Sequence, residues 1–256
     1  MLVLIRKIVT IAMLMSGVVS TASSSTRGDV QIIEAAENIQ YLSQKIAIDY
    51  FFYFHKQKNV NSKRKFNNNI KKLEYYISEI TNRTKNEQTK DLLDYFTYRI
   101  EEIKILFDEN ITEANARILL THSEGFLEGT KLIIEKHKYQ FSKEEEMLML
   151  SKKAQYLLEK VITYYMASKI GLNSKYKQEK MKDAIIEIDE VMKKINEYKY
   201  SFALKKKVEK FSTIWATNRM FFNNSEGASI PYLLLDSTQY TKKILVDIEK
   251  YHKKNL

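Results

Sequence analysis

The chain has 256 residues, with one proline, six glycines and no cysteine, and 44% of the residues are apolar. This length suits one large domain or two smaller ones, and the apolar fraction excludes a disordered chain. The absence of cysteine excludes disulfides, thiolate metal sites and cysteine nucleophiles. Because the turns of strand-rich folds draw on glycine and proline, their scarcity predicts an all-α fold made of long helices.

The N-terminus has the pattern of a secretory signal peptide. Arg6 and Lys7 precede an apolar run over 8–19, and the small residues Ser20 and Ala22 follow it. We therefore predict a signal peptide over 1–22, cleaved after Ala22, and a periplasmic protein. The alternative is an uncleaved anchor, although the run is shorter than the ~20 residues that a spanning helix needs.

The formal net charge is +10, and it stays strongly positive without the predicted signal peptide. In an exported protein, this charge favours contact with anionic surfaces or small anions, and we expect no nucleic-acid partner. A lysine-rich face that is merely solvated is the alternative.

Four helices are predicted in the first half, because apolar residues recur there in alternating steps of four and three. The polar segments "KNVNS", "TNRTKNE" and "DENIT" separate the four helices. Ser43 is the one interruption of the first apolar seam. The seams run from Ile32 to Tyr53, Phe66 to Ile80, Leu93 to Phe107 and Leu127 to Phe141, with the fourth helix starting near Thr112.

The second half repeats this pattern. Its seams run from Leu150 to Tyr164, Met181 to Ile195 and Leu204 to Trp215, with a break at Gly171 after the first. The last helix starts near Pro231, which suits a first-turn position, and runs to the C-terminus.

The two halves also align residue by residue. "NIQYLSQKIAIDYF" at 38 matches "KAQYLLEKVITYYM" at 153 with an offset of 115, and "LLTHS" at 119 matches "LLLDS" at 233 with an offset of 114. An offset that is held within one residue indicates a duplicated unit. We predict two tandem up-down four-helix bundle modules, over 23–141 and 142–256. The joining segment "QFSKEEEMLML" is also compatible with one helix that continues from the first module into the second.

The first helix carries polar side chains close to its apolar seam: Gln40, Ser43, Gln44 and Lys45. They form either a polar patch for a small ligand or partner helix, or a buried hydrogen-bond network that fixes helix register. Gln155 and Lys160 are the matching polar residues of the second copy, which is less polar and which we expect to be mainly structural.

The stretch "IIEAAENIQYLSQKIAIDYF" resembles the N-terminal sensor domain shared by type IV pilus chemotaxis transducers (PilJ) and nitrate sensors (NarX). Lys45 stands where that family has an arginine, and the repeat at 149–165 resembles a weaker second copy. The resemblance covers nearly the whole mature chain as architecture, and about fifteen residues as a motif. The matching residues are Ile33, Ala36, Leu42, Ser43, Gln44 and Ala47.

The resemblance implies a sensor-like module that binds a small ligand, or relays a signal to a membrane-bound chemoreceptor or histidine kinase. We expect no output domain in the chain itself, and the resemblance adds a homodimer as an option. In the nitrate-sensing branch, an arginine from each of two subunits holds the anion. Gln40 stands at that position, and its neutral amide cannot replace a guanidinium fork, so nitrate is not implied. The alternative function is a structural or interaction protein of the cell envelope.

Other chemistry has weak support in the sequence. His137 and His252 lie at matching helix ends, where a cation complements the helix dipole, and neither they nor His55 and His122 belong to a metal-ligand motif. We expect no metal, no cofactor and no enzymatic activity, because the motifs for phosphate binding or nucleophilic catalysis are absent. Asn110, in "DENIT", fits an extended bacterial N-glycosylation sequence, although a chance match is the better explanation.

Overall fold

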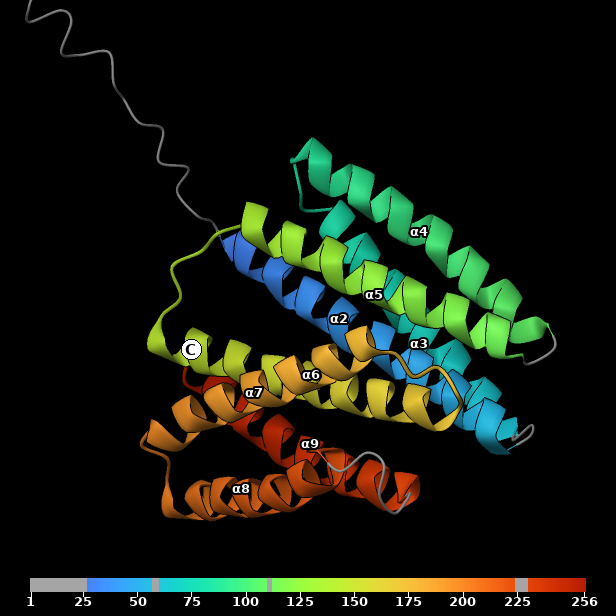
Figure 1. Ribbon diagram of the computed structural model, residues 1–256. Helices are drawn as coiled ribbons and strands as arrows, with labels where there is room; N and C mark the ends of the chain where they lie inside the picture. The colour runs from blue at the N-terminus through green and yellow to red at the C-terminus, as the bar shows by residue number, and fades with distance from the viewer. Residues whose placement is uncertain (1–26, 57–59, 110–111, 224–229) are drawn as a thin grey trace, which may run out of the picture.

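The computed structural model describes residues 27–56, 60–109, 112–223 and 230–256, and these residues form eight α-helices and no strand. The all-α prediction is therefore confirmed. The predicted signal peptide and Asn110 lie outside the described residues. The helices are α2 (Arg27–Lys56), α3 (Val60–Thr81), α4 (Glu87–Asp108), α5 (Glu113–Lys136), α6 (Lys143–Lys169), α7 (Lys175–Glu197), α8 (Phe202–Asn223) and α9 (Pro231–Lys254) (Figure 1).

The helix ends follow local chemistry. Asn86 and Thr112 accept hydrogen bonds from backbone N–H groups at the starts of α4 and α5, as side chains at this position commonly do. α3 begins at Val60, within the predicted break "KNVNS". Gly171 follows α6 with a φ of +86°, a conformation that glycine adopts without strain.

A single helix joining the two halves is not formed. α5 ends at Lys136, and Ser142 and Glu145 form a reciprocal capping box at the start of α6. The box satisfies backbone N–H groups that a continuous helix would have bonded internally, so it fixes a new helix start. The pattern Ser-x-x-Glu is visible in the sequence and identifies this boundary.

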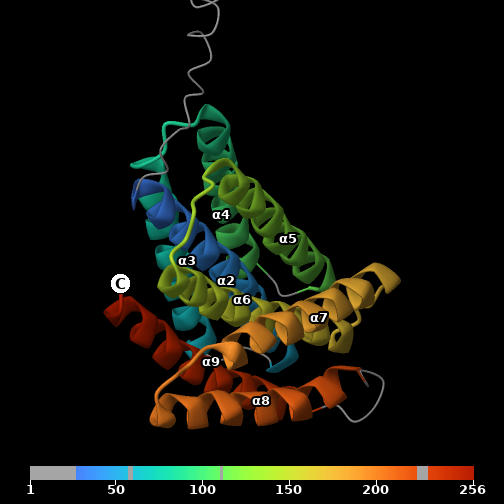
Figure 2. The same cartoon turned by 90° about the vertical axis from the view of Figure 1, so that its left-hand side faces the viewer.

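Two helices form the centre of the molecule. α2 packs against α3, α5 and α6, while α6 packs against α7, α9 and α2. α4 lies beside α5 and α3, and α8 lies beside α9 and α7, so the order of packing is the same in both halves. Figures 1 and 2 show α4 and α8 at opposite ends of the molecule, with α2 and α6 between them.

The outer helices bury the predicted seams, whereas α2 and α6 are buried on nearly all sides. The α7 seam is an example of the first kind, because Ile188 is fully buried while Ile186 is 55% exposed. In α6, consecutive residues from Tyr156 to Ala167 are all buried. Among the described residues, no helix is long and apolar enough to cross a membrane.

A histidine at the end of the last helix makes equivalent contacts in each half. His137, at the end of α5, places Nδ1 3.0 Å from Asp29 Oδ1 at the start of α2. His252, at the end of α9, places Nδ1 2.6 Å from Glu144 Oε2 at the start of α6. His252 and Glu144 lie 115 residues after His137 and Asp29, respectively. The ring Nε2 atoms also match, because they face hydroxyl groups that follow the second helix of each half.

These hydroxyl groups are Thr84 Oγ1, 3.2 Å from His137 Nε2, and Tyr200 OH, 3.1 Å from His252 Nε2. Each histidine thus ties the fourth helix of its half to the first helix and to the loop between the second and third. The sequence predicts that both histidines lie at helix ends. Their partners come from distant segments, which spacing within one helix cannot indicate.

A substitution at Gly129 tests how tightly α5 packs on α4. A Cβ atom at this position would lie 2.6 Å from ring atoms of the buried Phe96. Gly129→Ala should therefore lower the free energy of unfolding by about 1–3 kcal/mol through overpacking, despite the better helix propensity of alanine. Urea unfolding monitored by circular dichroism measures this change.

Gly125, one turn earlier, provides the control. A Cβ atom there would lie 3.4 Å from the hydroxyl group of the exposed Tyr95, which can move aside. Gly125→Ala should leave stability unchanged or raise it by up to about 1 kcal/mol. Equal effects of the two substitutions would show that α4 does not press on α5 at Gly129.

Candidate functional site

Two of the predicted site residues are tied into the centre of the protein. The Ser43 hydroxyl donates to the Gln40 carbonyl oxygen at 2.8 Å, within α2. Gln44 Nε2 donates to Ser123 Oγ on α5 at 2.6 Å, and the Thr163 hydroxyl on α6 donates to the Gln44 carbonyl oxygen at 3.3 Å. Gln44 thus links three helices, as the network interpretation of this stretch predicts.

The position matching Gln44 in the second half carries Glu159, which is fully buried. Its carboxylate contacts the ammonium group of Lys242 on α9, and Lys242 Nζ also lies 3.3 Å from the Tyr41 hydroxyl on α2. Burial lowers the pKa of Lys242, and the nearby charge of Lys45 lowers it further. An amide–hydroxyl contact in one half is therefore replaced by a charged contact in the other.

Lys45 differs from its neighbours because it faces a cleft. Its Nζ atom lies 3.1 Å from Asp49 Oδ1, and Asn69 Nδ2 on α3 donates to Asp49 Oδ2 at 2.7 Å. Both carboxylate oxygens of Asp49 therefore have a partner within the protein, and only 8% of the side chain is exposed. The three residues form a fixed polar group at the base of the cleft.

The cleft, which we call the α3–α9 cleft, has a volume of about 540 Å³. Each of its three helices contributes residues at positions i, i+3, i+4 and i+7, the spacing of one helix face. Its base is on α2 and its walls are on α3 and α9. The base consists of Lys45, Ile48, Asp49 and Phe52.

The two walls differ in chemistry. The α3 wall is polar and basic, and consists of Lys65, Asn68, Asn69 and Lys72. The α9 wall begins with apolar surface and becomes polar, with Tyr232, Leu235, Asp236 and Gln239. Because α9 belongs to the second half and the other two helices to the first, the cleft lies between the halves.

The second half contains the matching position, but it is nearly closed. Lys160 and Lys180 stand where Lys45 and Lys65 stand in the first half, and the space between them is only about 50 Å³. Tyr164 replaces Asp49, and its hydroxyl donates to Glu124 Oε1 at 3.0 Å. Burial lowers the pKa of Lys160, as expected for an ammonium group beside packed aromatic residues.

Gln40 and Gln155 face neither of these positions. Gln40 lines a space of about 200 Å³ that also contacts α5, α6 and α7, and Gln155 lines one of about 330 Å³ beside α9. Gln155 Nε2 lies 3.3 Å from Glu249 Oε2, which fixes its side chain. The six predicted site residues therefore lie at different positions around the paired helices α2 and α6, and they do not line one common pocket.

Several residues of the α3–α9 cleft were not predicted from the sequence. Asp49 could have been found, because it lies four residues after Lys45 on the same helix face. The polar run that contains Asn69 also stands out in the sequence. The α9 wall depends on how the two halves pack, so its residues have no local signal.

The part of the chain that the structure describes contains no group of three metal-ligating side chains. His122 on α5 is buried, with its Nε2 atom 3.5 Å from Glu102 Oε2 on α4. Burial lowers the pKa of His122, and Arg99 lowers it further. The side chain of His55 lies outside the described residues.

Comparison of the chain with models of protein families, with curated proteins and with solved structures gave no match. The resemblance of the first helix to the PilJ- and NarX-type sensor domain therefore stays a prediction from the residues that carry it.

The Lys242–Glu159 contact can be tested by removing one partner. Lys242→Met should lower the free energy of unfolding at pH 7 by about 3–5 kcal/mol, because Glu159 is left buried without its counter-charge. Combining Lys242→Met with Glu159→Leu should recover most of the loss. Urea unfolding of both variants measures the difference.

Lys207→Met is the control for the loss of a lysine from an ion pair. Lys207 Nζ lies 2.6 Å from Asp247 Oδ2 on the surface, where such a pair contributes about 1 kcal/mol or less. If Lys242→Met were no more destabilising than Lys207→Met, the buried contact would have no special role.

The raised pKa of Glu37 should make the stability of the protein depend on pH. Burial raises its pKa to about 7, against the opposing charges of Lys152 and Lys153, and its Oε2 atom has no hydrogen-bond partner among the described residues. Because the folded protein holds this proton more tightly than the unfolded chain, stability should fall as pH rises from about 4.5 to about 7. Glu37→Gln, which stays neutral, should match the wild type near pH 4.5 and exceed its stability at pH 8 by up to about 3 kcal/mol.

Chemical unfolding at a series of pH values checks this expectation. Glu190→Gln, on the exposed face of α7, removes one carboxylate without a buried environment and should leave the pH profile unchanged. A Glu37→Gln profile parallel to that of the wild type would contradict the assignment.

Proposed function

We propose that the protein is an exported sensor-like module that binds a small molecule in the α3–α9 cleft and passes the signal to a membrane partner. In this proposal, residues 1–22 are a cleaved signal peptide and the mature protein acts in the periplasm. The two halves are tandem up-down four-helix modules, over 23–141 and 142–256. The repeated order of helix packing and the matching histidine contacts support the tandem arrangement.

The observation that carries the binding proposal is the cleft itself. Its volume of about 540 Å³ lies within the range of about 300–1,000 Å³ that is typical of small-molecule sites. It combines an apolar side with a few fixed polar groups, which is also typical of such sites. A solvated basic surface would not need Asp49 to be buried and bonded at both oxygens.

The position of the cleft explains how binding could be relayed. A bound molecule would touch α2 and α3 of the first half and α9 of the second, so it would change the free energy of holding the two halves together. A ligand shifts a conformational equilibrium only through such a difference in contacts. The matching position around Lys160 is filled by Tyr164, so we propose one site per chain.

A thermal-shift screen of the purified chain against small metabolites, followed by calorimetry, tests the proposal. Leu235→Trp should fill the cleft and abolish binding, while the melting temperature stays close to that of the wild type. Leu233→Trp is the matched control, because Leu233 lies on the same helix with 62% of its surface exposed and does not line the cleft. It should bind as the wild type does.

The proposal fails if no compound binds, or if Leu235→Trp binds as well as Leu233→Trp. Lys72→Ala should weaken binding without a large loss of stability, because Lys72 lines the cleft, is exposed and has no ion-pair partner among the described residues. Gln44→Ala should do the reverse, since its amide group is bonded within the protein.

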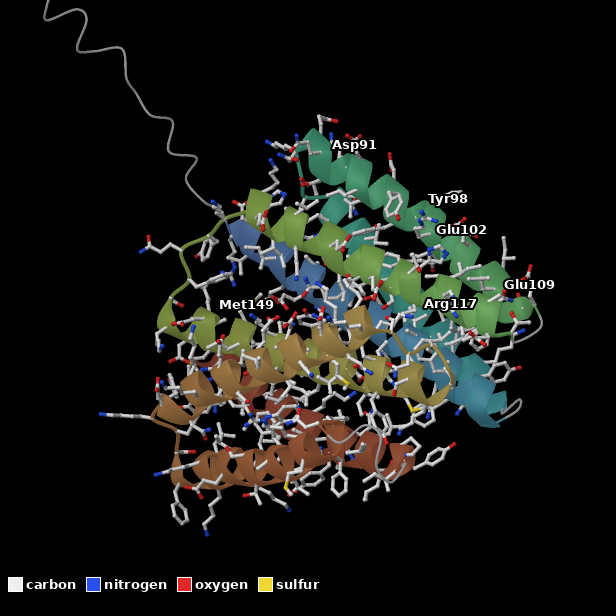
Figure 3. All side chains as sticks on the ribbon, viewed as in Figure 1. Asp91, Tyr98, Glu102, Glu109, Arg117 and Met149 are labelled. Atoms are coloured by element: carbon white, nitrogen blue, oxygen red, sulfur yellow. The ribbon has the colours of Figure 1, made fainter. Side chains whose placement is uncertain are left out.

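One observation favours the alternative, an interaction protein of the cell envelope. Tyr95, Tyr98 and Ile105 are exposed by 40%, 60% and 58% and lie along one side of α4. Figure 3 shows Tyr98 on this outer helix, near Glu102. The Arg99 guanidinium lies 4.7 Å and 5.7 Å from the two tyrosine ring centres, which gives this side mixed aromatic and charged chemistry. This alternative would be favoured if Tyr98→Glu abolished binding of an envelope partner and Leu235→Trp left that binding unchanged.

A further inference from the structure

The α3–α9 cleft has a chemical order along its length, which follows from the directions of its helices. Phe52 contacts Tyr232, with ring centres 5.3 Å apart, whereas Tyr41 contacts Lys242. Residue numbers thus fall along α2 as they rise along α9, so the two helices are antiparallel. The same holds for α2 and α3, because Asn69 contacts Asp49 and Arg83 contacts Gln31.

One end of the cleft is apolar. The Phe52–Tyr232 contact lies at this end, and Ile48 and Leu235 extend the apolar surface toward the middle. Lys65, one turn before Asn69 on α3, lies at the same level, on the exposed rim.

The middle of the cleft is acidic. Asp49 is occupied by Lys45 and Asn69, so it offers no free charge. Asp236 on the α9 wall lies at about the same level, is exposed, and forms no ion pair or hydrogen bond with the residues that the structure describes. It is therefore available to a cationic group in the cleft.

The other end is basic. Lys72 on α3 and Gln239 on α9 lie near the level of Lys45, and Lys242 lies just beyond, where burial and then the charge of Lys45 lower its pKa. Lys45 and Lys242 have carboxylate partners, whereas Lys72 has none in the described part of the chain. An anionic group at this end would be attracted to Lys72 and would relieve the repulsion among the three ammonium groups.

These three levels are close together. Asp236 and Gln239 are three residues apart on α9, which corresponds to about 4–5 Å along the helix axis. A ligand that satisfies all levels carries an anionic group, a cationic group one or two bonds away, and an apolar body on the other side. A free α-amino acid with an apolar side chain has this arrangement.

Resting on the proposed binding function, we infer that the ligand of the α3–α9 cleft is a zwitterionic α-amino acid with an apolar or aromatic side chain. Lys72 and Lys45 contact its carboxylate, Asp236 contacts its ammonium group, and the surface around Phe52, Tyr232 and Leu235 contacts its side chain. Neutralising both charges of the ligand inside the protein distinguishes it from a simple carboxylate or amine of the same size.

Three compounds with the same phenyl body test the inference by calorimetry at low salt: L-phenylalanine, 3-phenylpropanoate and 2-phenylethylamine. L-Phenylalanine should bind at least about tenfold more tightly than either of the other two, because it alone meets both charged levels. Equal binding of L-phenylalanine and 3-phenylpropanoate would overturn the inference, as would no binding of L-phenylalanine.

Two variants assign the contacts. Asp236→Asn should weaken L-phenylalanine binding to the level of 3-phenylpropanoate and leave 3-phenylpropanoate unchanged. Lys72→Gln should weaken both carboxylates and leave 2-phenylethylamine unchanged. Asp91→Asn on α4, which Figure 3 shows far from α9, and Lys71→Gln, an exposed neighbour outside the cleft, control for the change in net charge.

The outcomes separate this inference from the proposed function. If a compound of another class binds and Leu235→Trp abolishes that binding, the cleft is a site but its ligand is not an amino acid. If L-phenylalanine binds but Asp236→Asn and Asp91→Asn have the same effect, recognition of the ammonium group by Asp236 is wrong. If no compound of any class binds in the cleft, both the inference and the proposed function fail.

Discussion

The structure depends on the contact between α2 and α6, which are covered by other helices on nearly every side. A polar side chain in such a position loses its contact with water, so it must bond within the protein or line a cleft. Gln44 bonds to Ser123 and Glu159 contacts Lys242, whereas Lys45 opens onto a cleft. The constraint explains why polar residues crowd the apolar seam of the first helix. Gln44 fits the network interpretation of that stretch, and Lys45 belongs to the proposed ligand site.

The same constraint shows how two similar halves came to differ. Where the first half has Asp49, bonded to Lys45 and Asn69, the second has Tyr164, bonded to Glu124. A carboxylate at this position needs polar neighbours and leaves room, whereas a tyrosine ring fills the space and needs only one partner for its hydroxyl group. A single replacement thus accompanies the difference between a space of about 540 Å³ and one of about 50 Å³. The asymmetry supports one proposed ligand site in a chain with repeated architecture.

The position of the cleft also relates the proposed binding to the proposed relay. Its base lies on α2, the helix that connects both halves, and its wall on α9 comes from the second half. In the proposal, contacts made there act on the packing of the two halves. The histidine contacts involve the first turns of α2 and α6, away from the cleft, and they join the helices of each half at one end. These features favour a binding protein over an enzyme as the proposal.

Helix content, most helix ends and the apolar seams are determined by the sequence alone, because they follow from local spacing, caps and the scarcity of glycine and proline. The offset of 115 residues likewise predicts which positions match, including His137 and His252. Only the tertiary structure decides that α2 and α6 pack together, because a helix buried on all sides carries no single amphipathic face to reveal its partners. For the same reason, the sequence grouped Gln40, Ser43, Gln44 and Lys45 by proximity along the chain. The packed helices point them in different directions and bring Lys45 together with Asp236, which is distant in sequence.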